Sequence, residues 1–330
     1  RAYFEKLLDS SQQQKQLPLI FPLLIALFSG AVFSFSLAPY YWWWLAILSP
    51  ALLYATLHKR SAKQAFAIGW SYGFGLWFVG AFWLYTSIHV YGDTNAFLSV
   101  CMIAIMALVM GLFTAFQTWV YRRFFPETPL TFAPLWIVFE WAKTWVFTGF
   151  PWLFVGYAFT ERLLDGYAPL FGIYAISFVV IVLACAFVEV LRKRIFWVIP
   201  SALLVLGAWG ASYIQFVKPK DAKPLSVSLI QGNIPQDLKW LTEYQVRTLE
   251  IYAGLTQSEW GRDLIVWPES SIPLFQTDIE PFLDAMDAQA KKNHTAWVTG
   301  IPYWDVAKSH QVGSPLYYNS IMAGSYTHLT

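Results

Sequence analysis

A single carboxylate, Glu269, lies where the chain leaves a run of apolar residues. It follows Trp267 and Pro268 in the stretch LIVWPESSIP, residues 264–273. Proline has no N–H and cannot continue a strand ladder, so Glu269 stands just past the carboxyl end of a predicted strand, where functional groups of open α/β sheets collect. If it is partly desolvated beside Trp267, this carboxylate could act as a general base near neutral pH. The alternative is that Glu269 caps the following turn together with the two serines after it.

A second pair of ionisable residues, Glu140 and Lys143, lies inside an apolar run at a spacing that gives them one helix face. Charges within a membrane segment are candidates for function, but a structural bridge that faces a helix bundle is the interpretation we favour. The five histidines show no metal-ligand spacing, and Cys101 and Cys185 lie in apolar runs without a catalytic motif. We therefore predict no metal site, no cofactor and no disulfide.

The elements that position these residues fall into two regions, of which the first is apolar. Hydrophobic residues make up 57% of the 330 residues, charged residues make up 13%, and the mean hydropathy is +0.46, so most of the chain is expected in lipid. A helical span needs about 20 apolar residues. We predict a polytopic α-helical membrane domain over residues 1–217, with seven transmembrane helices near 17–37, 40–57, 64–85, 96–120, 131–149, 167–191 and 195–216.

Charges between the apolar runs are distributed on one side. If the N-terminus is cytoplasmic, Arg162 is the one basic residue of the outer loops. The inner segments hold Arg1, Lys6, Lys15, Lys59, Arg60, Lys63, Arg122, Arg123, Arg192, Lys193 and Arg194. This is the positive-inside distribution. With an odd number of spans, it predicts that everything after about residue 217 lies on the outer side of the membrane.

The second region, residues 218–330, begins with the polar linker KPKDAKP and then alternates short β-type runs with amphipathic segments. Strands are predicted at 225–230, 263–267, 295–301 and 316–323, and helices from residue 242 and at 280–292. The order β-α-β-α-β-β predicts an α/β layer architecture. In this arrangement Glu269 follows the second strand.

Several motifs together resemble a known family. The string WPES resembles the glutamate motif of the nitrilase superfamily, whose members use a Glu-Lys-Cys triad. The stretch VSLIQGNIPQDLKW (227–240) resembles the first strand and loop of one membrane-embedded branch. Together with the seven spans and GFPWLFVGY (149–157), these motifs resemble the apolipoprotein N-acyltransferase family from the first span to about Ala323. The resemblance implies a nitrilase-like αββα sandwich, of which residues 218–330 would be the truncated N-terminal part, on the periplasmic side of a bacterial inner membrane.

The resemblance also implies a reaction and its partners. A cysteine thiolate would take an acyl chain from a glycerophospholipid as a thioester and pass it to the amine of a diacylglyceryl apolipoprotein, with Glu269 as the general base. Trp240 would lie at the substrate-binding mouth and Asn319 near the site, although a buried packing tryptophan and an asparagine in a strand-end turn are equally open. The glycine- and proline-broken loop around Trp152 is expected to line a lipid entry groove. We expect a monomer that contacts membrane lipid and no nucleic acid.

The chain departs from the family pattern at its end. The nucleophilic cysteine, the catalytic lysine and an eighth span are expected beyond the strand that holds Asn319, but only the ending GSYTHLT follows Ala323. We expect this ending to be foreign sequence or a truncation scar, and the chain as written to be inactive. Two alternatives stay open: a membrane-tethered nitrilase-type amidase that acts on a small soluble amide, and a polytopic transporter in which Glu140 and Lys143 mark the substrate path.

Overall fold

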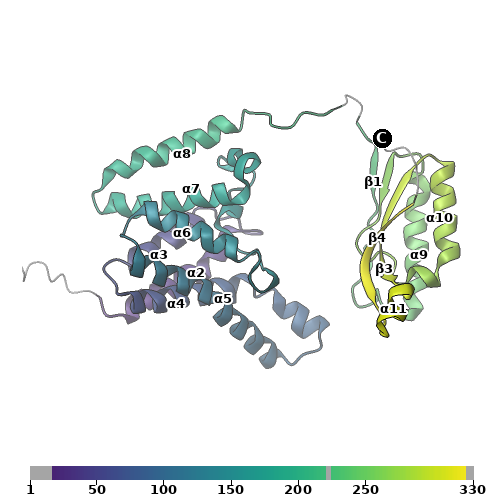
Figure 1. Ribbon diagram of the computed structural model, residues 1–330, viewed down its shortest axis with the longest axis horizontal. Helices are drawn as coiled ribbons and strands as arrows, with labels where there is room; N and C mark the ends of the chain where they lie inside the picture. The colour runs from purple at the N-terminus through teal and green to yellow at the C-terminus, as the bar shows by residue number, and fades with distance from the viewer. Residues whose placement is uncertain (1–16, 221–223, 325–330) are drawn as a thin grey trace, which may run out of the picture. The chain divides into compact units, whose positions relative to one another are not determined.

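The computed structural model describes residues 17–220 and 224–324. The chain divides into two compact units, Arg1–Lys218 and Pro219–Thr330, which are described one at a time (Figure 1). Some of the sequence-based expectations concern residues outside this description. These are the first three basic residues of the inner segments, the middle of the KPKDAKP linker and the residues after Gly324.

Unit 1 consists of helices, and its seven described α-helices coincide with the seven predicted apolar runs. They are α2 (Ile20–Phe33), α3 (Leu45–Thr56), α4 (Ala62–Gly80), α5 (Ala96–Phe124), α6 (Pro129–Ala142), α7 (Ala168–Leu191) and α8 (Val198–Ala211). By length and composition, two described segments could cross a membrane, Ala96–Phe124 and Asp165–Leu191. Three shorter apolar helical segments accompany them, at Ile20–Ser36, Leu45–Thr56 and Ile195–Ala211. The helical prediction is confirmed, whereas multi-pass insertion stays a proposal.

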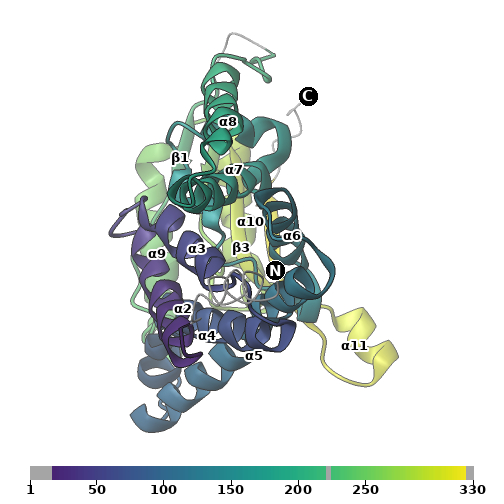
Figure 2. The same cartoon turned by 90° about the vertical axis from the view of Figure 1, so that its left-hand side faces the viewer.

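Close contacts between helices depend on small residues. Helix α4 lies against both α2 and α5 (Figure 2). A Cβ atom added at Gly73 of α4 would lie 2.6 Å from the Cα atom of Gly111 in α5, so the two backbones touch. Ser49 of α3 joins the same bundle, because its hydroxyl lies 2.8 Å from the Tyr72 hydroxyl and donates to the Ser29 carbonyl at 2.7 Å. Small and hydroxyl-bearing residues hold helices together in this way in apolar surroundings.

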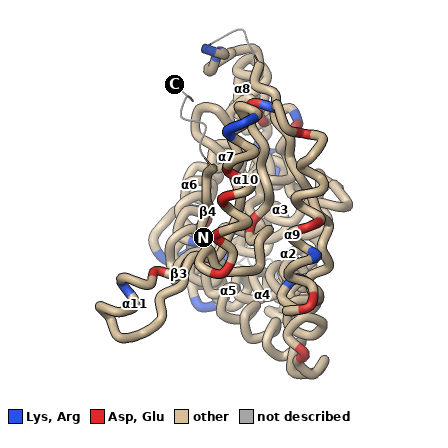
Figure 3. Tube along the Cα trace, turned by 90° about the vertical axis from the view of Figure 1, so that its right-hand side faces the viewer, with Lys and Arg blue, Asp and Glu red and all other residues tan. Residues whose placement is uncertain are grey.

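Basic residues of the predicted inner segments meet at one end of unit 1. Arg122, near the end of α5, donates from Nε to the Arg60 carbonyl at 2.8 Å, and Arg60 donates to the Leu17 carbonyl at 2.8 Å. These contacts connect the start of α2, the α3–α4 connection and the end of α5. Most of the other residues of the chain are neither acidic nor basic (Figure 3).

Unit 2 contains one four-stranded sheet of order β1-β2-β3-β4 among the described residues. Strands β1 (Val227–Leu229), β2 (Leu264–Val266) and β3 (Ala296–Trp304) are parallel, and β4 (Tyr317–Gly324) pairs antiparallel with β3. Helices α9 (Thr242–Thr256) and α10 (Glu280–Lys292) cover one face of the sheet (Figure 1). The strands and these two helices were predicted.

Helix α11 (Val306–Val312) was not predicted, so the β-α-β-α-β-β order is wrong at this point. Its sequence VAKSHQV carries no apolar stripe. It is defined by its ends: the Asp305 carboxylate accepts a hydrogen bond from the Lys308 backbone N–H at 2.9 Å, and Gly313 ends the helix with a φ of 75°.

The core of unit 2 lies between the sheet and helices α9 and α10. Ile265 of β2 and Trp297 of β3 are fully buried there, together with Tyr252 of α9 and Met286 of α10. Because neighbouring residues of a strand point to opposite faces, the residues adjacent to these face the other way. That second face includes exposed apolar side chains in the described residues, among them Leu229 and Ile321.

Candidate active site

The turn after β2 places Glu269 at the edge of the sheet. Trp267 still pairs with β3, since its backbone N–H donates to the Val298 carbonyl at 2.8 Å. Pro268 ends the ladder, and Ser270 takes a φ of 46°, which turns the chain out of the sheet. Glu269 is exposed among the described residues. The sequence predicted that the Glu269 carboxylate is partly desolvated beside Trp267. In the part of the chain that the structure describes this prediction is wrong, because the turn carries the carboxylate past the buried tryptophan.

Strand β3 fastens this turn through residues that the sequence did not single out. The Gly300 N–H donates to the Pro268 carbonyl at 3.3 Å, and the hydroxyls of Ser271 and Thr299 lie 2.8 Å apart in a buried contact. A Cβ atom at Gly300 would lie 2.7 Å from the Glu269 Cα atom, so only glycine allows this approach. Gly300 therefore fixes where the glutamate backbone lies.

The Glu269 side chain is held from β4. The Asn319 side-chain amide donates through Nδ2 to Glu269 Oε1. Asn319 is the third residue of β4, opposite Pro302 of β3, so the alternative of an asparagine in a strand-end turn is wrong. The structure thus brings together two predicted site residues that are 50 positions apart. In the described residues, the hydrogen bond seen for this carboxylate comes from Asn319 and not from the turn that follows Glu269.

Lys239 and Trp240 lie beside the same turn. Lys239 Nζ is 3.3 Å from the Glu269 backbone oxygen and 5.7 Å from the centre of the Trp240 ring. Trp240 is 52% exposed, so the alternative of a buried packing tryptophan is wrong. Lys239 was not predicted, and its only signal is its place in the motif QGNIPQDLKW. Its ammonium group adds positive charge beside the backbone of Glu269.

Two hollows adjoin the Glu269–Asn319 pair. The first, which we call the aromatic hollow, has a volume of about 650 Å³, and Asn319, Trp240, Phe275, Tyr317 and Tyr318 contribute to its wall. The second has a volume of about 460 Å³ and lies against the sheet face, where Glu269, Gly300 and Asn319 line it. Asn319 borders both hollows. Of these two hollows, Glu269 lines the second, where a carboxylate can take a proton from a bound group.

In unit 1, the segment after α6 holds the other predicted binding residue, Trp152. This side chain is 47% exposed, and its ring centre lies 5.5 Å from that of Phe150 and 6.0 Å from that of Trp83. Helix α6 ends at Ala142, before the predicted end at residue 149. The backbone has left the helical conformation by Trp145, whose φ is −137°, and Phe147 and Thr148 then adopt positive φ angles.

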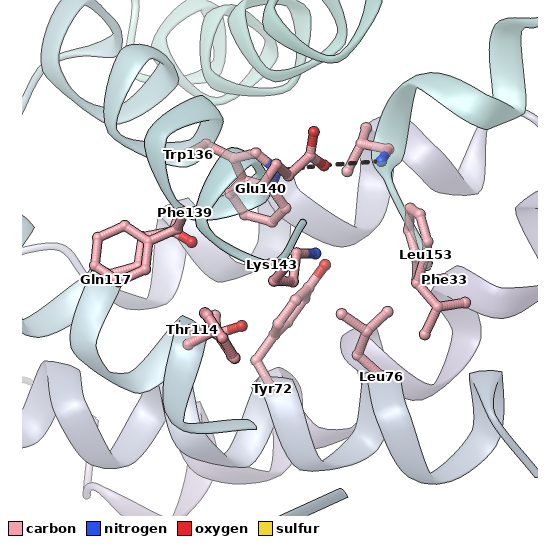
Figure 4. Close-up of a pocket in the computed structure, with 12 residues that line it drawn as sticks. Phe33, Tyr72, Leu76, Thr114, Gln117, Trp136, Phe139, Glu140, Lys143 and Leu153 are labelled. Atoms are coloured by element: carbon pink, nitrogen blue, oxygen red, sulfur yellow. Dashed lines mark hydrogen bonds between the residues drawn. The ribbon is translucent and has the colours of Figure 1, made fainter. Parts of the chain in front are cut away.

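Glu140 and Lys143 are buried in the same part of unit 1 (Figure 4). Among the ion pairs of the described residues, none joins them, so the predicted direct bridge is wrong. Glu140 and Lys143 each contact other groups of the chain instead. Cys101 and Cys185 also belong to unit 1, in α5 and α7, and Cys185 is buried. The described residues contain no cluster of histidine, cysteine and acidic side chains that could hold a metal ion.

Comparison with known proteins gives the same two parts. Residues 226–325 match the carbon-nitrogen hydrolase domain, and residues 29–186 match the apolipoprotein N-acyltransferase N-terminal domain. The fold and these matches define a class, namely proteins in which a carbon-nitrogen hydrolase domain follows an apolar helical region along the chain.

Named relatives are similar to most of the chain. One relative, named apolipoprotein N-acyltransferase, from Coxiella burnetii, is 37% identical over 292 residues, which cover 85% of this chain and 60% of the relative. A second with the same name, from Vibrio vulnificus, is 37% identical over 317 residues, 92% of this chain and 60% of the relative. Over most of its length the chain is thus similar to apolipoprotein N-acyltransferases. It spans about 60% of the length of these curated relatives.

Proposed function

We propose that the protein transfers a fatty acyl chain from a glycerophospholipid to the N-terminal amine of a diacylglyceryl apolipoprotein. The observation that carries this proposal is the contact between Glu269 and Asn319 beside the aromatic hollow, in the region that matches the carbon-nitrogen hydrolase domain. The names of the relatives supply the acyl transfer and the apolipoprotein acceptor, and the resemblance of the sequence motifs supplies the glycerophospholipid donor. An exposed carboxylate, oriented by one amide and bordered by aromatic walls, suits proton transfer next to an apolar substrate chain.

The reaction proceeds in two proton-balanced steps. Glu269 first takes the proton of a cysteine thiol, and the thiolate attacks the ester carbonyl of the phospholipid. The ester C–O bond breaks, and the lysophospholipid oxygen leaves with the proton from Glu269. In the second step the apolipoprotein amine attacks the thioester, Glu269 takes the amine proton, and the thiol is regenerated as the C–S bond breaks. A covalent intermediate divides one difficult transfer into two easier ones.

The remaining residues support the carboxylate and the substrates. Asn319 donates a hydrogen bond to Glu269 Oε1, which leaves the other carboxylate oxygen to accept and release the proton. Trp240 and the aromatic hollow contact the acyl chain, and Trp152 of unit 1 contacts membrane lipid. The family triad also needs a lysine for the oxyanion and the cysteine itself, which we assign to the part of the relatives that this chain does not span. Unit 1 crosses the bacterial inner membrane several times, with unit 2 on the periplasmic side.

Replacing the proposed base tests this function. In the whole protein, Glu269→Gln keeps an acceptor for Asn319 but removes the basic oxygen, so acyl transfer should fall by about 10²- to 10⁴-fold, the usual contribution of a general base. Mass spectrometry of a lipopeptide acceptor incubated with labelled phospholipid measures the rate. Glu250→Gln, an exposed acid of α9, is the matched control and should keep the wild-type rate. Full transfer by Glu269→Gln, or hydrolysis of soluble amides without transfer, would overturn the proposal.

A further inference from the structure

One cavity in unit 1 gathers polar groups inside an otherwise apolar bundle (Figure 4). Glu140 and Lys143 at the end of α6 and Gln117 of α5 line it, and their exposed fractions are 2%, 8% and 4%. Glu140 Oε2 and Gln117 Nε2 are buried without a hydrogen-bond partner among the described residues. Burying such groups in apolar surroundings costs free energy unless hydrogen bonds or charge interactions compensate, and polar groups buried in apolar helices are candidates for function. The other contacts of Glu140 and Lys143 all involve the chain around them.

Glu140 binds the segment that follows α6. Its Oε1 atom accepts two hydrogen bonds at 3.0 Å, one from Trp136 Nε1 in the previous turn of α6 and one from the Val155 backbone N–H. Val155 lies 15 residues further along the chain. One buried carboxylate oxygen therefore joins α6 to the segment 149–159.

Lys143 binds the same segment in two ways. Its backbone carbonyl accepts a hydrogen bond from the Phe150 N–H at 2.7 Å. Its ammonium group lies 4.9 Å from the centre of the Phe154 ring and 5.8 Å from that of Trp77 in α4, close enough for cation–π attraction. Hence both ionisable residues contact segment 149–159.

The backbone around this segment needs such support. Phe147, Thr148 and Leu153 have φ angles of 53°, 72° and 57°, in the left-handed region that L residues rarely adopt. Each such residue costs on the order of 1 kcal/mol. A segment with this conformation persists only if surrounding contacts hold it. Beyond Glu140 and Lys143, the Gly156 N–H donates to the Ser177 hydroxyl of α7 at 2.9 Å.

We propose that Glu140 is a positioning residue that sets the conformation of segment 149–159 and so presents Trp152 to the acyl chains of the phospholipid. This inference rests on the proposed function. Ring contacts lead from buried Trp77 to Phe150 at 5.1 Å and on to half-exposed Trp152 at 5.5 Å, so the position of the exposed ring depends on the buried end.

Amide hydrogen exchange tests the positioning step without any catalysis. In the purified chain, Glu140→Ala should speed exchange in peptides covering 149–159 by about tenfold or more, because the Val155 N–H loses its acceptor. Glu140→Gln retains Oε1 as an acceptor and should restore protection. Exposed Glu161→Ala is the matched control and should leave 149–159 unchanged. Wild-type protection in Glu140→Ala would overturn the inference.

A second variant covers the case in which Glu140→Ala disturbs the whole bundle. Val155→Pro removes the N–H donor and leaves Glu140 in place, and the extended conformation of Phe154 (φ −75°, ψ 137°) suits a following proline. Exchange should then rise within 149–159 and stay unchanged in α4 and α5. Protection of 149–159 in this variant would also contradict the inference.

Kinetics on the whole protein test the link to lipid. Glu140→Ala should raise the KM for phospholipid severalfold, leave kcat within about twofold, and leave the KM for the lipopeptide acceptor unchanged, whereas Glu140→Gln should resemble wild type. Faster exchange with an unchanged phospholipid KM would overturn the link to lipid. Failure of the proposed function can be told apart from failure of this inference. It would appear as full acyl transfer by Glu269→Gln, while the hydrogen-exchange effect of Glu140→Ala would remain.

Discussion

At the scale of single residues, Glu127 shows how a short polar connection between two helices is fixed. It lies between α5 and α6, where it accepts hydrogen bonds from the Lys59 backbone N–H at 2.9 Å and from Arg122, and lies 2.7 Å from His58 Nδ1. Partial burial on its own would raise the pKa of this carboxyl, but the hydrogen bonds and the Arg122 charge outweigh burial and lower it. The charged form is thus favoured in the folded state.

This lowered pKa predicts a pH-dependent contribution to stability. A carboxyl group whose pKa is lower in the folded state stabilises the fold above its unfolded pKa, and the contribution is lost as the pH falls through the folded pKa. Glu127→Ala should lower the free energy of unfolding by about 1 kcal/mol at pH 7, since the site is partly exposed and screened. The difference from wild type should shrink below about pH 4. Thermal unfolding in detergent measures it, with Glu161→Ala as control; a gap that stays constant on acidification would contradict this account.

The sequence identifies some site residues and leaves others hidden. Glu269 could be predicted because proline ends a strand immediately before it, and that is a local signal. Its contact with Asn319 depends on the pairing of β3 with β4. Gly300 and Lys239 come near Glu269 only through the folded chain, and neither carries a local pattern that indicates a site. The sequence therefore predicts the candidate base itself, whereas the residues that orient it can be identified only from the tertiary structure.

At the scale of elements, Gly300 joins β3 to the turn after β2. A methyl group there would lie 2.6 Å from the Ser270 nitrogen and 2.8 Å from the Pro268 oxygen, both of which are backbone atoms that cannot rotate away. Gly300→Ala should therefore displace the turn that carries Glu269. We expect acyl transfer by the whole protein to fall by at least about tenfold, since small misplacements of a catalytic group are costly.

A glycine with open space supplies the control for this prediction. Gly254 in α9 has no atom near the position of an added Cβ, so Gly254→Ala should keep full activity and raise stability by up to about 1 kcal/mol. Transfer rates and thermal unfolding of both variants measure the effects. Equal activity of the two alanine variants would show that the turn tolerates displacement.

The success of the element predictions follows from the strength of each pattern. Seven long apolar runs and the alternation in unit 2 gave the helices and strands, because their periods repeat over many residues. The end of α6 was misplaced because apolar residues continue past Ala142 although the backbone has left the helix. The short helix α11 was missed because only its capping residues define it. Composition cannot report such local backbone changes.

At the scale of the whole molecule, the exposed face of the unit 2 sheet suggests a missing layer. Leu229 of β1 is 76% exposed and Ile321 of β4 is 79% exposed, on the face opposite helices α9 and α10. A sheet face with exposed apolar residues normally packs against another layer. We propose that the remainder of a nitrilase-like αββα sandwich covers this face in the whole protein.

The basic end of unit 1 bears on how the molecule sits in a membrane. Besides the Arg60–Arg122 contact, Glu189 near the end of α7 is fully buried and binds Arg192 and Arg194 at 2.8 Å, and it accepts a hydrogen bond from Tyr54 of α3 at 3.0 Å. The connections α3–α4 and α7–α8 thus carry basic residues held by structure. Basic connections are enriched on the cytoplasmic side of membrane proteins, and we propose that these two lie there.

Labelling of introduced cysteines tests this orientation. In a Cys101→Ala, Cys185→Ala background, Lys63→Cys marks the basic end, Glu161→Cys the opposite side and Glu250→Cys unit 2; all three positions are exposed. A membrane-impermeant maleimide should label Glu161→Cys and Glu250→Cys in intact cells with a permeabilised outer membrane, and Lys63→Cys only after lysis. Labelling of Lys63→Cys with protection of Glu250→Cys would reverse the orientation and remove unit 2 from the periplasmic lipoproteins that we propose as its substrates.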